Sequence, residues 1–163
     1  MDLSLLAFIG VSAAAAMSGA LFKPGEWYDG LAKPWWNPPK FVFPLVWSIL
    51  YAMIAVSGWM AWHAATPEQL PLAMAVFGAQ LALNALWSAI FFGMKRMRLA
   101  MIEVVFLWAS IAINIAVFWS ADPRAALLLV PYLIWVSIAS YLNWTMIRLN
   151  PNADAAGSMA RSA

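Results

Sequence analysis

The chain has 163 residues, of which 65% are hydrophobic and 10% are charged, and its formal net charge is +2. Soluble domains carry about 25% charged residues, so this composition indicates a protein that lies in a lipid bilayer. Without cysteine, and with His63 as its single histidine, the sequence excludes a disulfide framework, a zinc–thiolate site and bis-histidine haem ligation. It contains no basic run or stripe, which excludes nucleic acid as a partner. We expect no metal site and no obligate cofactor.

Five apolar runs along the chain each have about the length that spans a bilayer. We expect helices over residues 3–22, 44–63, 72–92, 99–119 and 124–149. The first run resembles a signal peptide, but it lacks a positive n-region and Asp2 is acidic, so we interpret it as a retained helix. Pro131 is expected to kink the fifth helix just before Trp135. The prediction is an all-α membrane protein with one five-helix domain over residues 1–163 and a disordered tail over 150–163.

The first loop, residues 23–43, reads KPGEWYDGLAKPWWNPPKFVF. Its prolines and glycines forbid a continuous helix, yet it is rich in tryptophan and other aromatic residues. Two interpretations fit: an aromatic belt at the membrane–water interface, or a structured lid over a cavity between the helices. For the lid, Asp29 is expected to pair with Lys33, Lys40 or an arginine of the third loop. The residues assigned to the lid are Asp29, Lys33, Trp36 and Asn37.

Basic residues are distributed unevenly between the two ends of such a bundle. Of the nine Lys and Arg residues, only Arg124 falls on the side opposite the first loop. The positive-inside rule therefore predicts a multi-pass protein whose N-terminus is outside and whose first loop and C-terminus are cytoplasmic. The residues on the loop side are Lys23, Lys33, Lys40, Lys95, Arg96, Arg98, Arg148 and Arg161.

Three helix faces combine a bulky aromatic residue with a second aromatic, small or polar residue one turn away. Ordinary helix packing explains any single face of this kind. Together they predict an apolar pocket with a few orienting polar groups, suited to a flat and largely hydrophobic ligand. The faces are Trp47 with Tyr51, Asn84 with Trp87 and Ser88, and Trp135 with Ala139 and Asn143.

The third helix also carries small residues at four-residue spacing, which permits close contact between membrane helices. We assign them to the interface of a homodimer. In the fourth helix, Glu103 lies about one turn inside the basic connection, and we expect it to snorkel toward Arg98 or Lys95. The small residues are Ala75, Gly78, Ala79 and Ala82.

The sequence resembles the translocator protein family, whose members are also called tryptophan-rich sensory proteins or peripheral-type benzodiazepine receptors. The resemblance implies a five-helix bundle, typically a homodimer, with a pocket that the first loop closes and that binds porphyrins such as protoporphyrin IX. The motifs that carry it are Trp27-Tyr28-Asp29, Lys33-Pro34 with Trp36-Asn37-Pro38-Pro39, Pro44 with Trp47 and Tyr51, Gln80 and Asn84 with Trp87, and Pro131-Tyr132 with Trp135.

The resemblance implies a membrane receptor or regulator for porphyrins, linked to tetrapyrrole homeostasis or stress signalling. One alternative is a light-assisted porphyrin-degrading enzyme, with Trp47 and Trp135 as redox-active side chains, although no acid–base pair or nucleophile stands out. Another is a transporter of tetrapyrroles or sterols. The cholesterol motif of the animal members is not matched, because six residues separate Tyr141 from Arg148 where the pattern allows at most five. The implied pocket residues are Trp27, Tyr28, Trp47, Tyr51, Asn84, Trp87, Ser88, Trp135 and Ala139.

Overall fold

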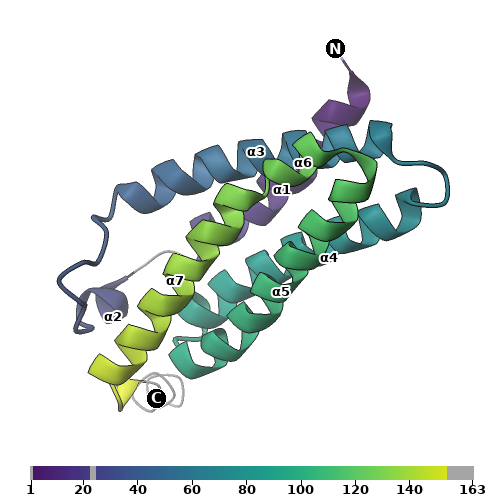
Figure 1. Ribbon diagram of the computed structural model, residues 1–163. Coiled ribbons are helices and arrows are strands. Elements are labelled where there is room, and N and C mark those ends of the chain that lie inside the picture. The colour runs from purple at the N-terminus through teal and green to yellow at the C-terminus, as the bar shows by residue number, and fades with distance from the viewer. Residues whose placement is uncertain (1, 23–24, 154–163) are drawn as a thin grey trace.

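The computed structural model describes residues 2–22 and 25–153, and within them it contains five helical segments long and apolar enough to cross a membrane (Figure 1). The predicted fold class, an all-α bundle of five spans, is confirmed. Of the tail predicted to be disordered, residues 154–163 lie outside the described residues. The helices are α1 (Leu3–Leu21), α2 (Glu26–Asp29), α3 (Val42–Ala64), α4 (Leu70–Ser88) with the π-helix η1 (Ala89–Gly93), α5 (Met97–Ala121), α6 (Pro123–Leu127) and α7 (Val130–Leu149).

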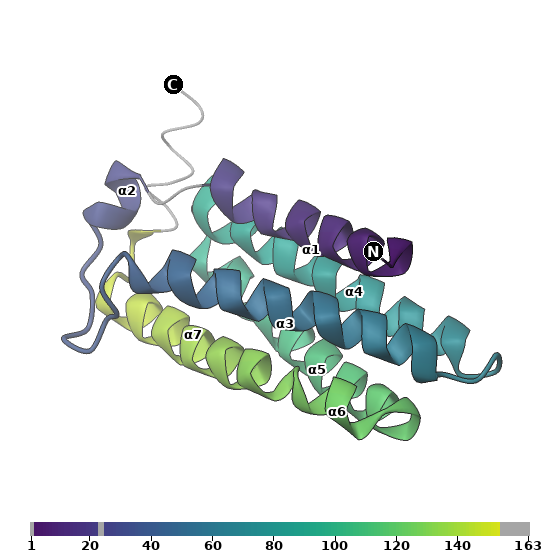
Figure 2. The same cartoon turned by 90° about the horizontal axis from the view of Figure 1, so that it is seen from above.

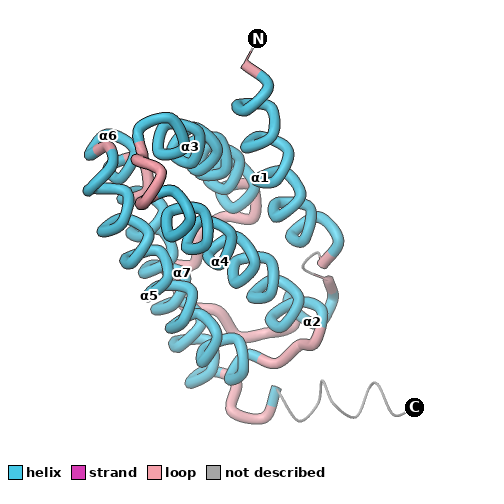
Figure 3. Tube along the Cα trace, turned by 90° about the vertical axis from the view of Figure 1, so that its right-hand side faces the viewer, coloured by secondary structure: helices cyan, strands magenta, loops and turns pink. Residues whose placement is uncertain are grey.

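The five spans run alternately up and down, so that alternate connections meet at the same end of the bundle (Figures 1 and 2). The first loop with α2, the connection between α4 and α5, and the end of α7 share one end. The N-terminus and the connection between α3 and α4 lie at the other. α1 packs against α3 and α4, and α5 packs against both α4 and α7. Figure 3 shows the bundle from another side, with α1 beside α3.

The fifth span is interrupted rather than kinked. α6 ends at Leu127 and α7 begins at Val130, so Pro131 occupies the first turn of α7. A proline is tolerated there, because the first N–H groups of a helix have no intrahelical partner. α7 then continues through Trp135 without a break, so the kink predicted just before Trp135 is wrong.

The buried apolar side chains form two clusters. The bundle cluster lies between the spans and includes Phe8, Ile54, Phe77, Ile111 and Tyr132. The loop cluster joins the first loop to the ends of η1, α5 and α7, and includes Tyr28, Leu31, Phe91, Met97, Leu142 and Met146. Trp87 packs against both clusters, so the two clusters meet at the last turn of α4.

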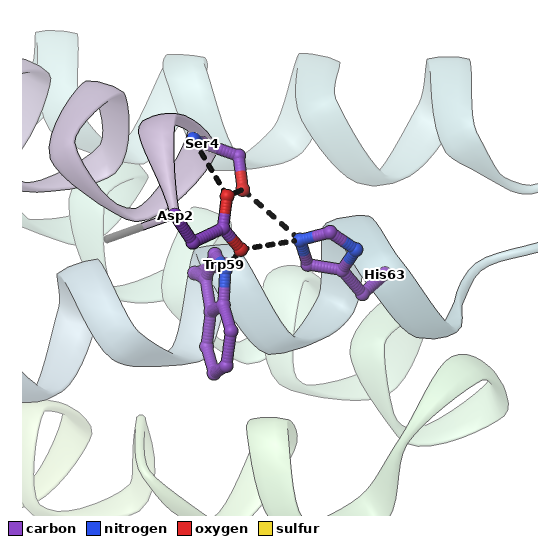
Figure 4. Close-up of polar contacts among 4 residues, drawn as sticks. All are labelled: Asp2, Ser4, Trp59 and His63. Atoms are coloured by element: carbon purple, nitrogen blue, oxygen red, sulfur yellow. Dashed lines mark hydrogen bonds and ion pairs between the residues drawn. The ribbon is translucent and has the colours of Figure 1, made fainter.

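A polar cluster ties the N-terminal end of α1 to the C-terminal end of α3 (Figure 4). Oδ1 of Asp2 accepts hydrogen bonds from the Ser4 N–H at 2.9 Å and the Ser4 hydroxyl at 2.6 Å. Oδ2 accepts one from the Trp59 indole at 2.7 Å and lies 3.2 Å from Nε2 of His63. These hydrogen bonds, led by that of the Ser4 hydroxyl, lower the pKa of Asp2 to about 2.

Because the pKa of Asp2 is about 2 in the fold against 3.8 in a model peptide, the folded protein favours the charged carboxylate. This contribution to stability is present above about pH 4 and is lost as the pH falls to about 2. Asp2→Asn should therefore lower the melting temperature at pH 7 and flatten its decline between about pH 4 and about pH 2. A Glu26→Gln control, at an exposed residue of the opposite end, should keep the natural curve. An Asp2→Asn curve parallel to the natural one at acidic pH would contradict the role of this cluster.

Candidate functional site

Aromatic rings fill the space between α3 and α7. The backbone of α3 packs closely on α6 but approaches α7 at few positions. The Trp47 ring lies 5.5 Å from that of Tyr51 and 6.0 Å from that of Tyr132, measured between ring centroids. Nearer the first loop, Phe43 meets Trp135 edge-on at 5.8 Å. Two of the predicted faces, on α3 and α7, are thus brought together by these rings.

A short hydrogen-bond chain joins α3, α4 and α7 beside these rings. The Tyr51 hydroxyl donates to Oδ1 of Asn84 at 2.5 Å, and Nδ2 of Asn84 donates to the Tyr132 hydroxyl at 2.7 Å. Asn84 is buried, and the hydrogen-bond partners on its two sides fix the orientation of its amide. Ser88 and Ala139 are half-buried on α4 and α7. The role of Tyr132 as a partner of Asn84 was not predicted, because a tyrosine in a motif does not reveal which amide it faces.

The first loop covers the end of this aromatic region with α2. Trp27 and Tyr28 contact the Phe91 ring at 6.0 and 6.3 Å, and Tyr28 also contacts Phe92 at 5.6 Å. Trp87 stacks on Phe91 at 5.0 Å from within α4. The π-helix η1 carries both phenylalanines, and such a wide turn shifts the face that each residue presents. Sequence periodicity did not predict η1, although π-helical turns are frequent at functional sites.

The first loop is fastened internally by its charged residues. Nζ of Lys33 donates to the carbonyl oxygens of Tyr28 at 2.6 Å and Leu31 at 3.1 Å. Of the partners predicted for Asp29, the structure selects Lys40, at 2.6 Å, and this pair lowers the pKa of Asp29. Both members of the pair belong to the loop, so it stabilises the conformation of the loop and does not join the loop to the helices.

The other two residues assigned to the loop lie farther along it. Trp36 stacks on Tyr141 of α7 at 5.3 Å, with the two planes 16° apart. Nδ2 of Asn37 donates to the Pro38 carbonyl at 3.1 Å. Trp36 therefore holds the outer edge of the loop against α7, while Asn37 shapes the turn between the prolines.

Several buried polar atoms around this region have no hydrogen-bond partner within the described part of the chain. They include the indole nitrogens of Trp27, Trp87 and Trp135, the carboxyl oxygens of Glu103 and the amide of Asn143. A buried polar group without a partner costs about 1–3 kcal/mol. Such groups are of the kind that a bound molecule with polar atoms would satisfy.

Glu103 differs most from its prediction. Its side chain is only 6% exposed, and it lies on the buried stripe of α5. On that stripe Ala100 belongs to the loop cluster and Leu107 to the bundle cluster, so Glu103 sits at the junction of the two. The prediction that it snorkels toward Arg98 or Lys95 is wrong, because its face of α5 points into the bundle. An intramembrane carboxyl facing the interior is a candidate functional group.

Two apolar grooves lie on the outer surface. One, of about 720 Å³, runs between α1 and α4 and is lined by Val11, Trp62, Gly78 and Ala82, among others. The other, of about 280 Å³, lies between α3 and α7, and Trp135 forms part of its wall. The residues assigned to a dimer interface are all exposed on α4, and they are Ala75, Gly78, Ala79 and Ala82.

Comparison with known proteins identifies the family of this chain. The model of the TspO/MBR family matches residues 5–149, which is most of the chain. The chain belongs to the TspO/MBR family. It is therefore an integral, multi-pass membrane protein, in agreement with its five candidate spans. Among the residues that the structure describes, no group of three or more histidine or acidic side chains is placed to hold a metal ion.

Other members of the family resemble the chain over nearly its whole length. A tryptophan-rich sensory protein of Cereibacter sphaeroides is 46% identical over 157 residues, which covers 96% of this chain and 98% of the relative. Protein CrtK of Rhodobacter capsulatus is 42% identical over 153 residues, covering 93% and 96% of the two chains. The human translocator protein is 34% identical over 137 residues, covering 81% of each.

Proposed function

We propose that this TspO/MBR family protein is a membrane receptor or regulator that binds a porphyrin of the protoporphyrin IX type between the first loop and the bundle. The observation that carries the proposal is the aromatic region around Trp47, Trp87 and Trp135. Aromatic rings stack on flat conjugated ligands, and the unpartnered indole N–H groups of Trp87 and Trp135 would donate to acceptor groups on the ligand.

The first loop is the lid of this site in the proposal. Trp27 and Tyr28 cover the end of the aromatic region through Phe91 and Phe92. Because the rings of Trp27 and Tyr28 contact those of Phe91 and Phe92, a porphyrin enters only when the first loop moves away from η1. To the ligand residues named from the sequence we add two: Tyr132, because it binds Asn84, and Glu103, because its buried oxygens have no partner within the described chain.

A regulatory role is supported by the names of the relatives. The Cereibacter sphaeroides protein is named a sensory protein, and a binding site without an acid–base pair suits sensing better than hydrolysis. The runner-up is light-assisted porphyrin degradation, which the position of Trp47 and Trp135 in the aromatic region favours. Either activity begins with binding at the same place.

A titration in detergent separates these functions. Protoporphyrin IX is added to the purified protein in darkness and then under illumination, and the absorbance is followed. A shifted spectrum that is stable in both conditions supports the receptor. Loss of the Soret band with a new product supports the enzyme. The transporter is tested in a separate assay, in which light-independent uptake of protoporphyrin IX into protein-containing vesicles would support it. Failure to shift the spectrum at any protein concentration would refute porphyrin binding.

For the orientation, we propose that the first loop faces the cytoplasm and the N-terminus lies outside. The described basic residues support it, since all but Arg124 lie at the end that holds the first loop. The positive-inside rule relates this asymmetry to the cytoplasmic side.

We also propose that two copies associate through the groove between α1 and α4. A Cβ atom added at Gly78 would meet no atom within 4 Å, so this face of α4 is open in the single chain. Gly78→Leu should therefore leave the folding of one chain intact and shift the detergent-solubilised protein from dimer to monomer, because the leucine blocks close approach. Light scattering with correction for detergent measures the change. Phe106→Leu, at an exposed site on α5, is the matched control. A Gly78→Leu protein that remains dimeric would move the interface elsewhere.

A further inference from the structure

Asn150, the residue directly after α7, binds the first loop with its side chain. The Ala32 N–H donates to Oδ1 of Asn150 at 2.9 Å, and Nδ2 of Asn150 donates to the Ala32 carbonyl at 2.9 Å. One carboxamide thus pairs with both backbone groups of one loop residue. The same Nδ2 donates to the Met146 carbonyl at 2.9 Å, so both of its hydrogens are used.

Among the side-chain hydrogen bonds within residues 25–153, this pair is the connection between the loop and the end of a helix. The other side-chain hydrogen bonds and ion pairs of loop residues 25–43 are made within the loop, through Lys33, Asn37 and the Asp29–Lys40 pair. The loop is therefore a unit that holds its own shape. Asn150 is the point at which these hydrogen bonds fix the described part of the loop to the end of α7.

The remaining contacts of the loop with the bundle are apolar: Leu31 packs in the loop cluster, and the aromatic residues of the loop contact rings of η1 and α7. Those of Trp27 and Tyr28 lie on the side of the proposed pocket, so a porphyrin that enters or leaves must part them. The stack of Trp36 on Tyr141 and the Asn150 pair lie on the side of α7. Apolar and ring contacts tolerate a range of distances and angles, whereas the Asn150 pair requires a narrow range of positions of Ala32.

We propose that Asn150 is the positioning residue that holds the first loop closed and thereby sets the rate at which a bound porphyrin is released. This inference rests on the proposed function, since it takes the aromatic region to be the ligand site. A simpler role is that Asn150 only caps α7 through the Met146 carbonyl, as residues at helix ends often do. The two roles change different quantities. A helix cap affects the stability of α7. A side chain that holds the first loop closed, here called a latch, affects ligand release and the exposure of the Ala32 amide.

The experiment compares the natural protein with Asn150→Ala and Asn150→Asp. Asn150→Asp keeps the size of the side chain and its acceptor but removes both donors, and it brings a carboxylate toward the carbonyls of Ala32 and Met146. Asn152→Ala, at an exposed neighbouring residue, is the matched control. Each full-length protein is studied in the same detergent. Release of protoporphyrin IX into excess acceptor vesicles is timed, and hydrogen–deuterium exchange across residues 27–36 is measured without ligand.

We expect release about tenfold faster in both Asn150 variants, because each loses hydrogen bonds that hold the closed loop. The amide of Ala32 should also exchange faster in them, while the melting temperature changes little and Asn152→Ala matches the natural protein. Unchanged exchange would overturn the latch. Faster exchange with unchanged release would overturn its role in ligand retention. If the natural protein binds no porphyrin, the proposed function fails, and exchange in the ligand-free protein still decides whether Asn150 holds the loop.

Discussion

Glu103→Met should raise the thermal stability of the ligand-free protein and weaken its binding of protoporphyrin IX. In the natural protein the carboxyl group is buried and its oxygens have no hydrogen-bond partner within the described chain. Methionine has similar length and no polar group to bury, so it removes this penalty, which is about 1–3 kcal/mol for a buried unpartnered group. In the proposed complex the carboxyl accepts a hydrogen bond from a donor group on the ligand. Its loss therefore costs affinity, and we expect a decrease of about tenfold or more.

Glu103→Gln is the matched control for this result. Glutamine keeps the size and hydrogen-bonding capacity of the side chain, so it should gain little stability and keep more of the affinity than methionine. Melting temperature and porphyrin affinity are measured on one preparation of each variant. A Glu103→Met protein with unchanged affinity would show that the carboxyl does not face the ligand, and a less stable one would show that Glu103 has a structural partner.

Trp47→Ala should weaken protoporphyrin IX binding by about thirtyfold. The indole contributes a stacking interaction and a large apolar area, and together these are worth about 2 kcal/mol or more to a flat ligand. Trp47 contacts both Tyr51 and Tyr132, so the variant should also lose some thermal stability. Equilibrium titration at a temperature where all variants are folded measures the affinity.

Two further variants make this test specific. Trp47→Phe keeps an aromatic face and should retain most of the affinity. Trp119→Ala removes a tryptophan that is 54% exposed at the far end of α5, and it should bind as the natural protein does. Full affinity in Trp47→Ala would place the porphyrin elsewhere, and an equal loss in Trp119→Ala would show that the effect is not local.

The sequence was sufficient for the fold because the bilayer restricts what can span it. Long apolar runs must be helices there, since every backbone N–H and C=O needs an internal partner. Spacing then placed Trp47 with Tyr51 and Trp135 with Ala139, because residues one turn apart share a helix face. Proline positions were less informative: Pro131 restricts the helix around it, but whether the chain kinks or stops depends on the preceding turn, which here ends α6 at Leu127.

The details of the candidate site could not be predicted because they depend on contacts between distant segments. Ala32 and Asn150 are separated by 118 positions, and nothing in either residue type indicates that they pair. The rotation of α5 that turns Glu103 inward is set by packing on α4 and α7. The π-helix η1 likewise arises where the end of α4 meets the first loop, and it has no periodic pattern of its own in five residues.

Photo-crosslinking with a diazirine-bearing protoporphyrin analogue tests the location of the ligand most directly. The full-length protein is saturated with the analogue in detergent, illuminated and digested, and the modified residues are identified by mass spectrometry. The proposed site predicts adducts on the first loop around Trp27 and on Trp47, Trp87 or Trp135, and competition by unlabelled protoporphyrin IX should abolish them. Competable adducts confined to Val11, Trp62 and their neighbours in the outer groove between α1 and α4 would contradict it.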